Sequence, residues 1–385
     1  MQLSFHGGFG EKGRTCIGVQ SGGYRMLLDA GVKTSARGLP GYYPAISPAE
    51  LAAVSAIVIT HAHEDHVGAL GWCFANGFRG RVLMTPATRA ECEAIVAGYG
   101  SASEASLVRN ARIDALAVGR DAAVLGPLRI TTGRSGHIVG GVWCLVDDGS
   151  TRFGYCGDVA ASSPVFAMDP LPACNAMALD ASYGDDDVSF ASRAAQIVEW
   201  IAAHPQGSVL PTPQFGRSLE LFSLLHVRVA LAPGMREALA QQIGATPWLV
   251  GNAAASLRRA LAAALDWREG DAFPQAPILC HDGMGMTGPA RALLREADRV
   301  DHPVLLTGHV PGGSPADRLR TAGKAAWVRL PTHPTLAENV SIARGCGASI
   351  VLGHSCEPEA LARLARHLPG LRIDIATGNR LDLAG

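Results

Sequence analysis

The sequence predicts an α/β protein in which one domain interrupts another. Short β-rich runs bounded by turn residues fill the first part of the chain, residues 1–188. Alanine-rich amphipathic segments alternate with short strands over residues 189–325, and short strands return over residues 326–385. We therefore expect a first domain in two pieces, with a second domain inserted between them.

The strands expected in the first part run into polar residues where they end. A helix is expected over residues 86–98, with Glu91 and Glu93 on a solvated face. The strands are expected over residues 2–5, 15–20, 25–29, 56–60, 81–85, 128–132, 142–147 and 151–156.

In the middle of the chain, helical and strand patterns take turns, which is typical of a sheet covered by helices. Helices are expected over residues 192–204, 219–229, 235–243, 253–265 and 289–296. Strands are expected over residues 208–211, 276–280 and 303–307. After residue 326, strands are expected over residues 327–330 and 349–352, and a last helix over residues 358–367.

The composition bounds the function as well as the fold. Hydrophobic residues make up 48% of the 385 residues, which is enough for a buried core. With 33 basic and 34 acidic residues the net charge is −1, so any polyanion must be held by a local basic cleft. No apolar run approaches the roughly 20 residues of a membrane span, and the nine cysteines stand singly. We expect a cytoplasmic protein with reduced thiols and no membrane partner.

The sharpest motif is His61-Ala62-His63-Glu64-Asp65-His66, directly after the apolar strand expected to end at Thr60. Three imidazoles and a carboxylate are suitable ligands for a borderline-soft divalent metal. A strand end followed by a turn can direct alternate side chains into two neighbouring coordination spheres. The alternative is a polar surface loop.

Similar ligand-type residues recur downstream. His137, Asp158 and His354 each lie beside a glycine and an apolar run, and Asp29 ends another expected strand. Glycine lets the backbone approach a crowded site closely. Singly, each of these residues could be a turn residue or a hydrogen-bonded core residue, but together with the histidine tract they indicate one site.

The tract and its ordered satellites resemble the metallo-β-lactamase superfamily. Further motifs are similar in order and spacing to the β-CASP branch, which includes ribonuclease J and the cleavage and polyadenylation endonucleases. These motifs surround Asp180, Arg217, Asp282, Thr307 and His333. The resemblance covers residues 1 to about 357 and implies an αββα metallo-β-lactamase sandwich with an inserted, shortened α/β β-CASP domain.

The resemblance also implies roles for individual residues. His61, His63 and His137 would hold a first metal ion, Asp65, His66 and His354 a second, and Asp158 would bridge the two. Asp29 would support the ligands from behind by accepting an imidazole N–H. Asp180 and His333 would form a general-acid unit, with a strand-end turn as the alternative for Asp180.

These roles imply a phosphodiester hydrolase that uses metal-activated hydroxide as its nucleophile, with Asp65 as a catalytic as well as a ligating residue. The expected cofactors are two divalent ions, with Zn²⁺ favoured over Mn²⁺. The expected substrate is RNA or single-stranded DNA, with Arg217 and Ser218 as candidate phosphate contacts. A homodimer is left open.

Other functions compete with this one. A small phosphodiester, ester or lactone is the alternative substrate, favoured by the near-zero net charge and the short inserted domain. A catalytically silent scaffold subunit is a third hypothesis. The sequence shows no stripe of interleaved basic and aromatic residues for base stacking; Phe215 and Tyr183 are candidates, with core packing as the simpler role for both.

Overall fold

The computed structural model describes residues 1–383, and this part of the chain divides into two compact units. Among the described residues, the first unit comprises residues 1–161, 168–187 and 333–383, and the second comprises residues 162–167 and 188–332. Residues 326–332, expected in the return segment, belong to the second unit because β17 (Ala326–Trp327) pairs with β16 (Leu305–Leu306).

Two seven-stranded sheets form the centre of the first unit. The first sheet has the order β20-β1-β2-β3-β4-β5-β6 and the second β19-β18-β11-β10-β9-β8-β7. The strands of the first sheet are β1 (Gln2–Gly7), β2 (Cys16–Ser21), β3 (Tyr24–Leu28), β4 (Ala56–Val58), β5 (Arg81–Met84), β6 (Ile113–Ala115) and β20 (Arg380–Asp382). Those of the second are β7 (Gly119–Leu125), β8 (Leu128–Arg134), β9 (Val142–Asp147), β10 (Arg152–Tyr155), β11 (Ala176–Asp180), β18 (Ile350–His354) and β19 (Leu371–Arg372).

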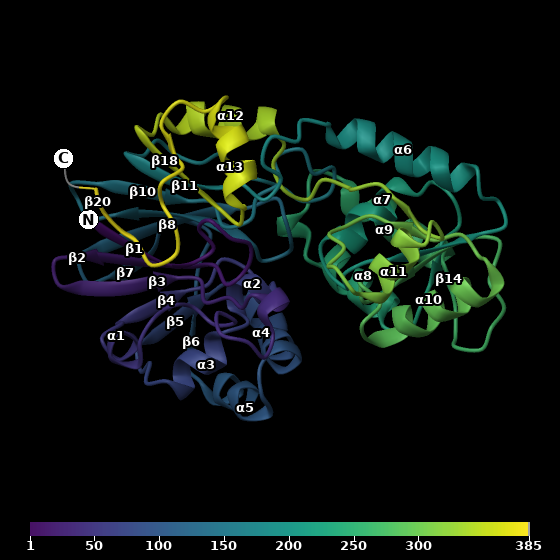
Figure 1. Cartoon of the computed structure of the whole chain (residues 1–385), viewed down its shortest axis with the longest axis horizontal. Helices are drawn as coiled ribbons and strands as arrows, with labels where there is room; N and C mark the ends of the chain where they lie inside the picture. Colours follow the sequence, from purple (N-terminus) through teal and green to yellow (C-terminus); the bar gives the residue numbers. More distant parts are fainter. Residues whose placement is uncertain (384–385) are drawn as a thin grey trace. The chain divides into compact units, whose positions relative to one another are not determined.

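Helices cover the outer faces of both sheets, so the first unit has four layers (Figure 1). The helices on the first sheet are α1 (Pro48–Ala52), α2 (Glu64–Val67), α3 (Leu70–Ala75), α4 (Pro86–Tyr99) and α5 (Ala102–Asn110). Those on the second sheet are α12 (Leu336–Cys346) and α13 (Pro358–Ala365). Each side has its own buried core, around Ile57 and Leu70 on one side and Leu179 and Leu361 on the other. The expected αββα sandwich is confirmed.

Local sequence signals explain where these helices begin. Ser47, Ser101 and Thr335 each accept from the third backbone N–H of their helix, and Glu50, Glu104 and Glu338 return the bond as capping boxes. The solvated face expected on α4 is only half correct. Glu93 is exposed and pairs with Arg109, whereas Glu91 is 7% exposed and lies on the packed face.

Parallel pairing in the sandwich collects strand ends at one edge. β3 and β4 are parallel, so the residues after Leu28 and Val58 leave the sheet together. β11 and β18 are also parallel, and their register places Asp180 opposite His354. Polar residues that are far apart in the sequence therefore leave neighbouring strands at the same level.

The second unit is a parallel sheet with helices around it (Figure 1). The order is β12-β15-β13-β14, and a bridge from Val209 to Val304 places the β16–β17 pair beside β12. The remaining strands are β12 (Ser208–Pro211), β13 (Ala230–Leu231), β14 (Leu265–Asp266) and β15 (Pro277–Cys280). The helices are α6 (Phe190–Ala202), α7 (Arg217–Leu224), α8 (Met235–Gly244), α9 (Ala253–Ala263), α10 (Gly288–Val300) and α11 (Pro315–Thr321).

The helix expected over residues 219–229 is shorter than predicted at its C-terminal end. α7 ends at Leu224, and Val229 instead offers its carbonyl to Leu265 at the start of the β13–β14 pair. The β-branched residues Val227 and Val229 favour this extended path. Within residues 1–383, no helix is long and apolar enough to cross a membrane.

Candidate metal centre

The histidine tract lies where β4 passes through a short turn into α2. His63 is the residue that precedes the first turn of α2, and His66 lies in that helix. His61 and His66 are fully enclosed, whereas the side chain of Asp65 is 32% exposed. The change from strand to helix directs neighbouring side chains of the tract to different sides of one buried space.

Three groups of side chains bring ligand-type atoms within 4.8 Å of one another. The first contains His61, His63, His137 and Asp158; the second contains Asp65, His66 and Asp158; the third contains Asp158, Asp180 and His333. Asp158 is common to all three groups. The fold thus collects six of the seven predicted metal ligands, together with the predicted general-acid pair.

The distances show how Asp158 joins the groups. Its Oδ1 lies 3.1 Å from His66 Nε2, and its Oδ2 lies 3.5 Å from His61 Nε2 and 3.7 Å from His137 Nε2. His137 Nε2 is also 3.1 Å from His63 Nδ1. One carboxylate therefore faces histidines of two groups with two different oxygens.

The hydrogen bonds in this cluster fit a bound cation. His61 Nε2, His66 Nε2 and Asp158 Oδ1 are buried and make no hydrogen bond. His66 Nδ1 lies 2.7 Å from Asp29 Oδ2, and because a carboxylate only accepts, Nδ1 carries the proton and donates. Burial would lower the pKa of His66, but the charges of Asp158, Asp65 and Asp29 raise it well above its usual value. Metal binding would displace the proton of Nε2 and leave its lone pair facing Asp158 Oδ1. Divalent ions between such atoms would satisfy all of them.

Asp29 holds the cluster from behind. Its carboxylate accepts from His66, from Thr60 N–H at 2.7 Å and from the Thr60 hydroxyl at 2.8 Å. The Tyr155 hydroxyl adds a fourth bond of 2.6 Å to Asp29 Oδ2. Sequence reasoning did not single out Thr60 or Tyr155 as supports. A tyrosine three residues before Asp158, at the buried end of β10, was the available signal.

His333 and Asp180 form a second hydrogen-bonded unit. His333 Nδ1 donates to Asp180 Oδ2 at 2.9 Å, and the same nitrogen is 3.8 Å from Asp158 Oδ2. The other oxygen of Asp180 accepts from the hydroxyl of Ser182 at 2.6 Å. Asn339 of α12 donates to the backbone carbonyl of Asp180 at 3.0 Å, which ties α12 to β11.

Burial and neighbouring charge oppose each other at His333 but act largely in the same direction at His63. Burial alone would lower the pKa of His333, but the charges of Asp180 and Asp158 outweigh it and raise that pKa to about 10. For His63, burial and the neighbouring imidazoles His61 and His137 both lower the pKa far below its usual value. His63 is therefore neutral, which is the form that binds a metal.

His354 lies at the border of the cluster and is outside all three groups. Its ring centre is 6.2 Å from that of His66. Its Nε2 donates to the Gly157 carbonyl at 3.0 Å, and its Nδ1 lies 3.1 Å from the Ser355 hydroxyl. Both ring nitrogens thus already have partners, so metal binding by His354 would require Nε2 to leave the carbonyl of Gly157.

The two predicted phosphate contacts, Arg217 and Ser218, lie at the start of α7 in the second unit. Arg217 is half-buried, its Nη2 donates to Thr332 Oγ1 at 3.3 Å, and its Nε is buried without a hydrogen bond. The Ser218 side chain is fully buried and donates to the Gln214 carbonyl at 2.8 Å. Of the two side chains, only Arg217 keeps an unused donor.

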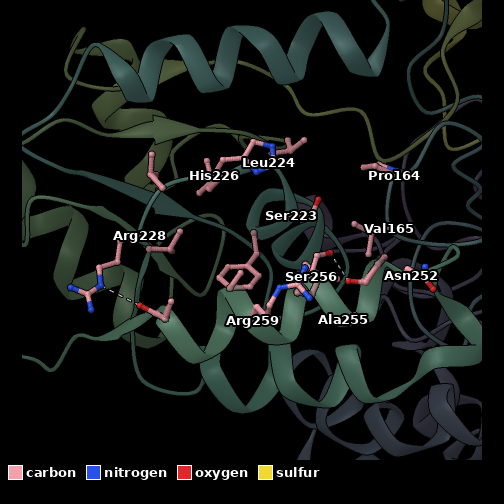
Figure 2. A pocket seen from close by; sticks show the side chains of 18 of the residues that line it. Pro164, Val165, Ser223, Leu224, His226, Arg228, Asn252, Ala255, Ser256 and Arg259 are labelled. Atoms are coloured by element: carbon pink, nitrogen blue, oxygen red, sulfur yellow. Dashed lines mark hydrogen bonds between the residues drawn. The ribbon is translucent and has the colours of Figure 1, made fainter.

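The second unit also contains a hollow of about 1360 Å³ beside α9 (Figure 2). Aliphatic side chains such as Val229 and Leu257 line much of it, and Arg228 donates across one end to the Ala263 carbonyl at 3.2 Å. Its lining includes one histidine, His226, but no carboxylate and no cysteine. This hollow lacks the ligand chemistry of the histidine cluster.

The histidine cluster lies in a chain that is similar to proteins of a known family. Residues 24–212 match the β-lactamase superfamily domain. A protein of unknown function from Enterococcus faecalis V583, known from its crystal structure, is 13% identical with a TM-score of 0.61, over 99% of both chains. That likeness supports the fold alone.

Three curated relatives have named activities. Transcription termination factor FttA of Methanococcus maripaludis is 25% identical over 58% of this chain. Endoribonuclease YSH1 of Mycosarcoma maydis is 27% identical over 56%, and cleavage and polyadenylation specificity factor 73 of Drosophila melanogaster is 24% identical over 62%. The matched regions span only 39%, 27% and 37% of these relatives, respectively.

Proposed function

The chain belongs to the metallo-β-lactamase superfamily, and on that premise we propose that it is a two-metal phosphodiester hydrolase acting on RNA or single-stranded DNA. The observation that carries the proposal is the shared position of Asp158, whose two oxygens face histidines of two separate ligand groups. A carboxylate placed in this way can bridge two cations. Two-cation sites are suited to in-line displacement at phosphorus.

We assign His61, His63, His137 and Asp158 to one cation, and Asp65, His66, Asp158 and His354 to the other. Histidine-rich sets with a carboxylate favour Zn²⁺, with Mn²⁺ as the alternative. When bound, the cations would supply the Lewis acidity that activates water and neutralises phosphoryl oxygens. Asp65, the most open carboxylate of its group, can also orient the attacking water.

His333 is proposed as the proton donor for the leaving oxygen. Asp180 accepts from Nδ1, which fixes the ring and leaves Nε2–H as the donor. The raised pKa keeps the ring protonated at neutral pH. Cations bound to Asp158 would neutralise part of its charge and bring the pKa of His333 closer to neutrality, where an acid works best.

The substrate class rests on the relatives, two of which are RNA-processing proteins by name. Arg217 is the proposed phosphate contact, because its buried Nε still lacks a hydrogen bond. Ser218 would contribute its backbone N–H at the start of α7, since its hydroxyl is engaged by Gln214. A cytoplasmic location fits the cysteines, which are buried and unpaired.

A small phosphodiester is the second candidate substrate, and the net charge of −1 favours it because long polyanions are usually bound by basic surfaces. A silent scaffold would not need the convergence of ligand atoms around Asp158.

One experiment separates these functions. Metal-loaded protein is incubated with labelled RNA, labelled single-stranded DNA and bis(p-nitrophenyl) phosphate, with and without chelator. We expect chelator-sensitive cleavage of at least one strand, with a rate that falls steeply as salt rises. Cleavage of the small ester alone would favour the second candidate. Protein that binds two equivalents of Zn²⁺ and cleaves none of these would contradict both.

A further inference from the structure

Trp327 is an unusual aromatic residue of the second unit because it is large, exposed and held in place. It ends the short strand β17, and its side chain is 40% exposed. Its indole N–H donates to the Gly308 carbonyl at 2.9 Å. The guanidinium carbon of Arg329 lies over the ring, 5.4 Å from its centroid. The ring is therefore fixed in direction and carries a cation near one face.

A second guanidinium lies against the same glycine. A Cβ on Gly308 would collide with the guanidinium of Arg217, so the absence of a side chain at this position lets Arg217 come close. Gly308 therefore contacts both Trp327, through its carbonyl, and Arg217, through its Cα. Arg217 also has the buried Nε without a hydrogen bond. An aromatic ring and two cations are thus assembled around one backbone position.

This combination matches the chemistry of single-stranded nucleic acid. Bases stack on exposed aromatic rings whatever their sequence, and guanidinium groups bind the phosphates between them. A peptide partner fits less well, because one arginine lies over the ring and a second lies against the glycine that accepts the indole N–H, rather than an apolar surface. Trp327 also precedes His333 by only six residues in the chain.

We propose that Trp327 is a base-stacking platform for single-stranded nucleic acid, with Arg329 and Arg217 binding the adjoining phosphates. The proposal rests on the proposed function and gives the second unit a binding surface for the same class of substrate. Residues 327 and 329 are two apart, as are residues on one face of an extended chain, but a single pair of this kind does not form a stripe in the sequence.

The test measures binding, with cleavage suppressed by a His333→Ala background in metal-loaded protein. Labelled 12-nucleotide RNA and DNA strands are titrated by fluorescence anisotropy. We expect Trp327→Ala to weaken binding by about 5- to 150-fold, the range for loss of one base–aromatic stack, and Trp327→Phe to lose much less. Trp200→Ala is the matched control, because Trp200 of α6 stacks on His204, two residues beyond the end of that helix, and its replacement should leave binding unchanged.

An abasic 12-mer of the same charge distinguishes stacking from general damage. Trp327→Ala should bind this strand as tightly as the parent does, because no base is present to stack. Arg329→Gln should weaken binding to both strands. It should also reduce the slope of log K for binding against log salt concentration by about 0.7, the value for one phosphate contact on a single strand.

Each remaining outcome has a single meaning. Equal binding by parent and Trp327→Ala would overturn the platform and leave the proposed nuclease standing. If Trp327→Ala weakens binding to the normal and abasic strands equally, Trp327 only supports the local structure after β17. That result would also overturn the proposed stacking platform. If the parent binds no strand and wild-type protein cleaves none, the proposed function itself fails.

Discussion

The histidine cluster of the first unit and the hollow of the second differ in almost every physical respect. The cluster is largely buried and crowded with titratable groups, and Asp29 supports it by accepting hydrogen bonds from His66 and Tyr155. The hollow is open and largely aliphatic, with no carboxylate in its lining. The volume of a cavity therefore does not identify the candidate catalytic site in this protein. The site is identified instead by polar atoms that converge on one point and lack hydrogen-bond partners.

The largest effect should come from the shared carboxylate. Asp158→Ala removes the only side chain common to the three ligand groups, so we expect both metals to be lost and cleavage to fall by more than about 10⁴-fold, or about 5 kcal/mol of barrier. Elemental analysis and strand cleavage measure the two effects. A variant that keeps two metal equivalents and full activity would remove the basis for calling Asp158 a bridge.

The next effect separates the chemistry from the metals. His333→Ala should retain both metals but slow cleavage by about 10²- to 10⁴-fold, the usual contribution of a general acid. Metal content and single-turnover rates are measured on the same sample. Loss of metal in this variant would instead make His333 a ligand, which its place in a group with Asp158 also allows.

The pH profile sharpens the role of the same residue. The charge of Asp180 raises the pKa of His333, so Asp180→Asn should lower that pKa and move the alkaline limb of the rate profile to lower pH. The protonated ring is the acid, so activity falls as pH rises through its pKa. An unchanged alkaline limb would argue against proton donation by His333.

A smaller effect is expected behind the ligands. Asp29→Ala removes the carboxylate that orients His66, and outer partners of this kind are worth about 10- to 100-fold in metal affinity. Tyr155→Phe removes one of the four bonds to that carboxylate and should cost less. Competition with a calibrated zinc chelator measures both. Wild-type affinity in Asp29→Ala would leave His66 oriented by its packing alone.

Glu91 tests whether a buried carboxylic acid outside the cluster lowers the free energy of unfolding. Burial raises the folded-state pKa of Glu91 from 4.5 to about 8, so the folded protein binds more protons than the unfolded chain between these values. The free energy of unfolding therefore falls as pH rises through this window. Glu91→Gln should match wild type at pH 4.5 and melt higher at pH 8.5, by about 2–4 °C per kcal/mol.

The matched control for that experiment is Glu93→Gln on the same helix. Glu93 is exposed and pairs with Arg109, so its replacement should shift the melting temperature little and show no comparable trend with pH. Parallel behaviour of the two variants would contradict the burial argument.

The smallest effect is expected in the hollow. Ala260→Glu places a charge on the exposed lining of α9 and should leave metal content and cleavage within about twofold of wild type, as is usual for surface changes away from a site. A large fall in strand cleavage with both metals retained would indicate that the substrate contacts the hollow. The contrast drawn between the two regions would then be wrong.

Most of the sandwich and the composition of its site could be predicted from the sequence because the signals are local. Strand ends, capping residues and the run from His61 to His66 depend on near neighbours in the chain, so they can be read directly. The placement of Glu91 could not, because Glu91 and Glu93 look alike until α4 packs against its neighbours. The shortened α7 was missed because helix and strand signals overlap near Val227.

Which residue types are available for metal binding, and in what order they occur, follows from the sequence alone. Only the tertiary structure decided that Asp158 faces two groups of histidines, that Tyr155 supports Asp29, and that His354 donates to the Gly157 carbonyl. The physical reason is that hydrogen bonds and ligand distances depend on sheet register and loop paths. They bring His354 to the carbonyl of Gly157, 197 positions earlier in the chain, and no local pattern records that contact.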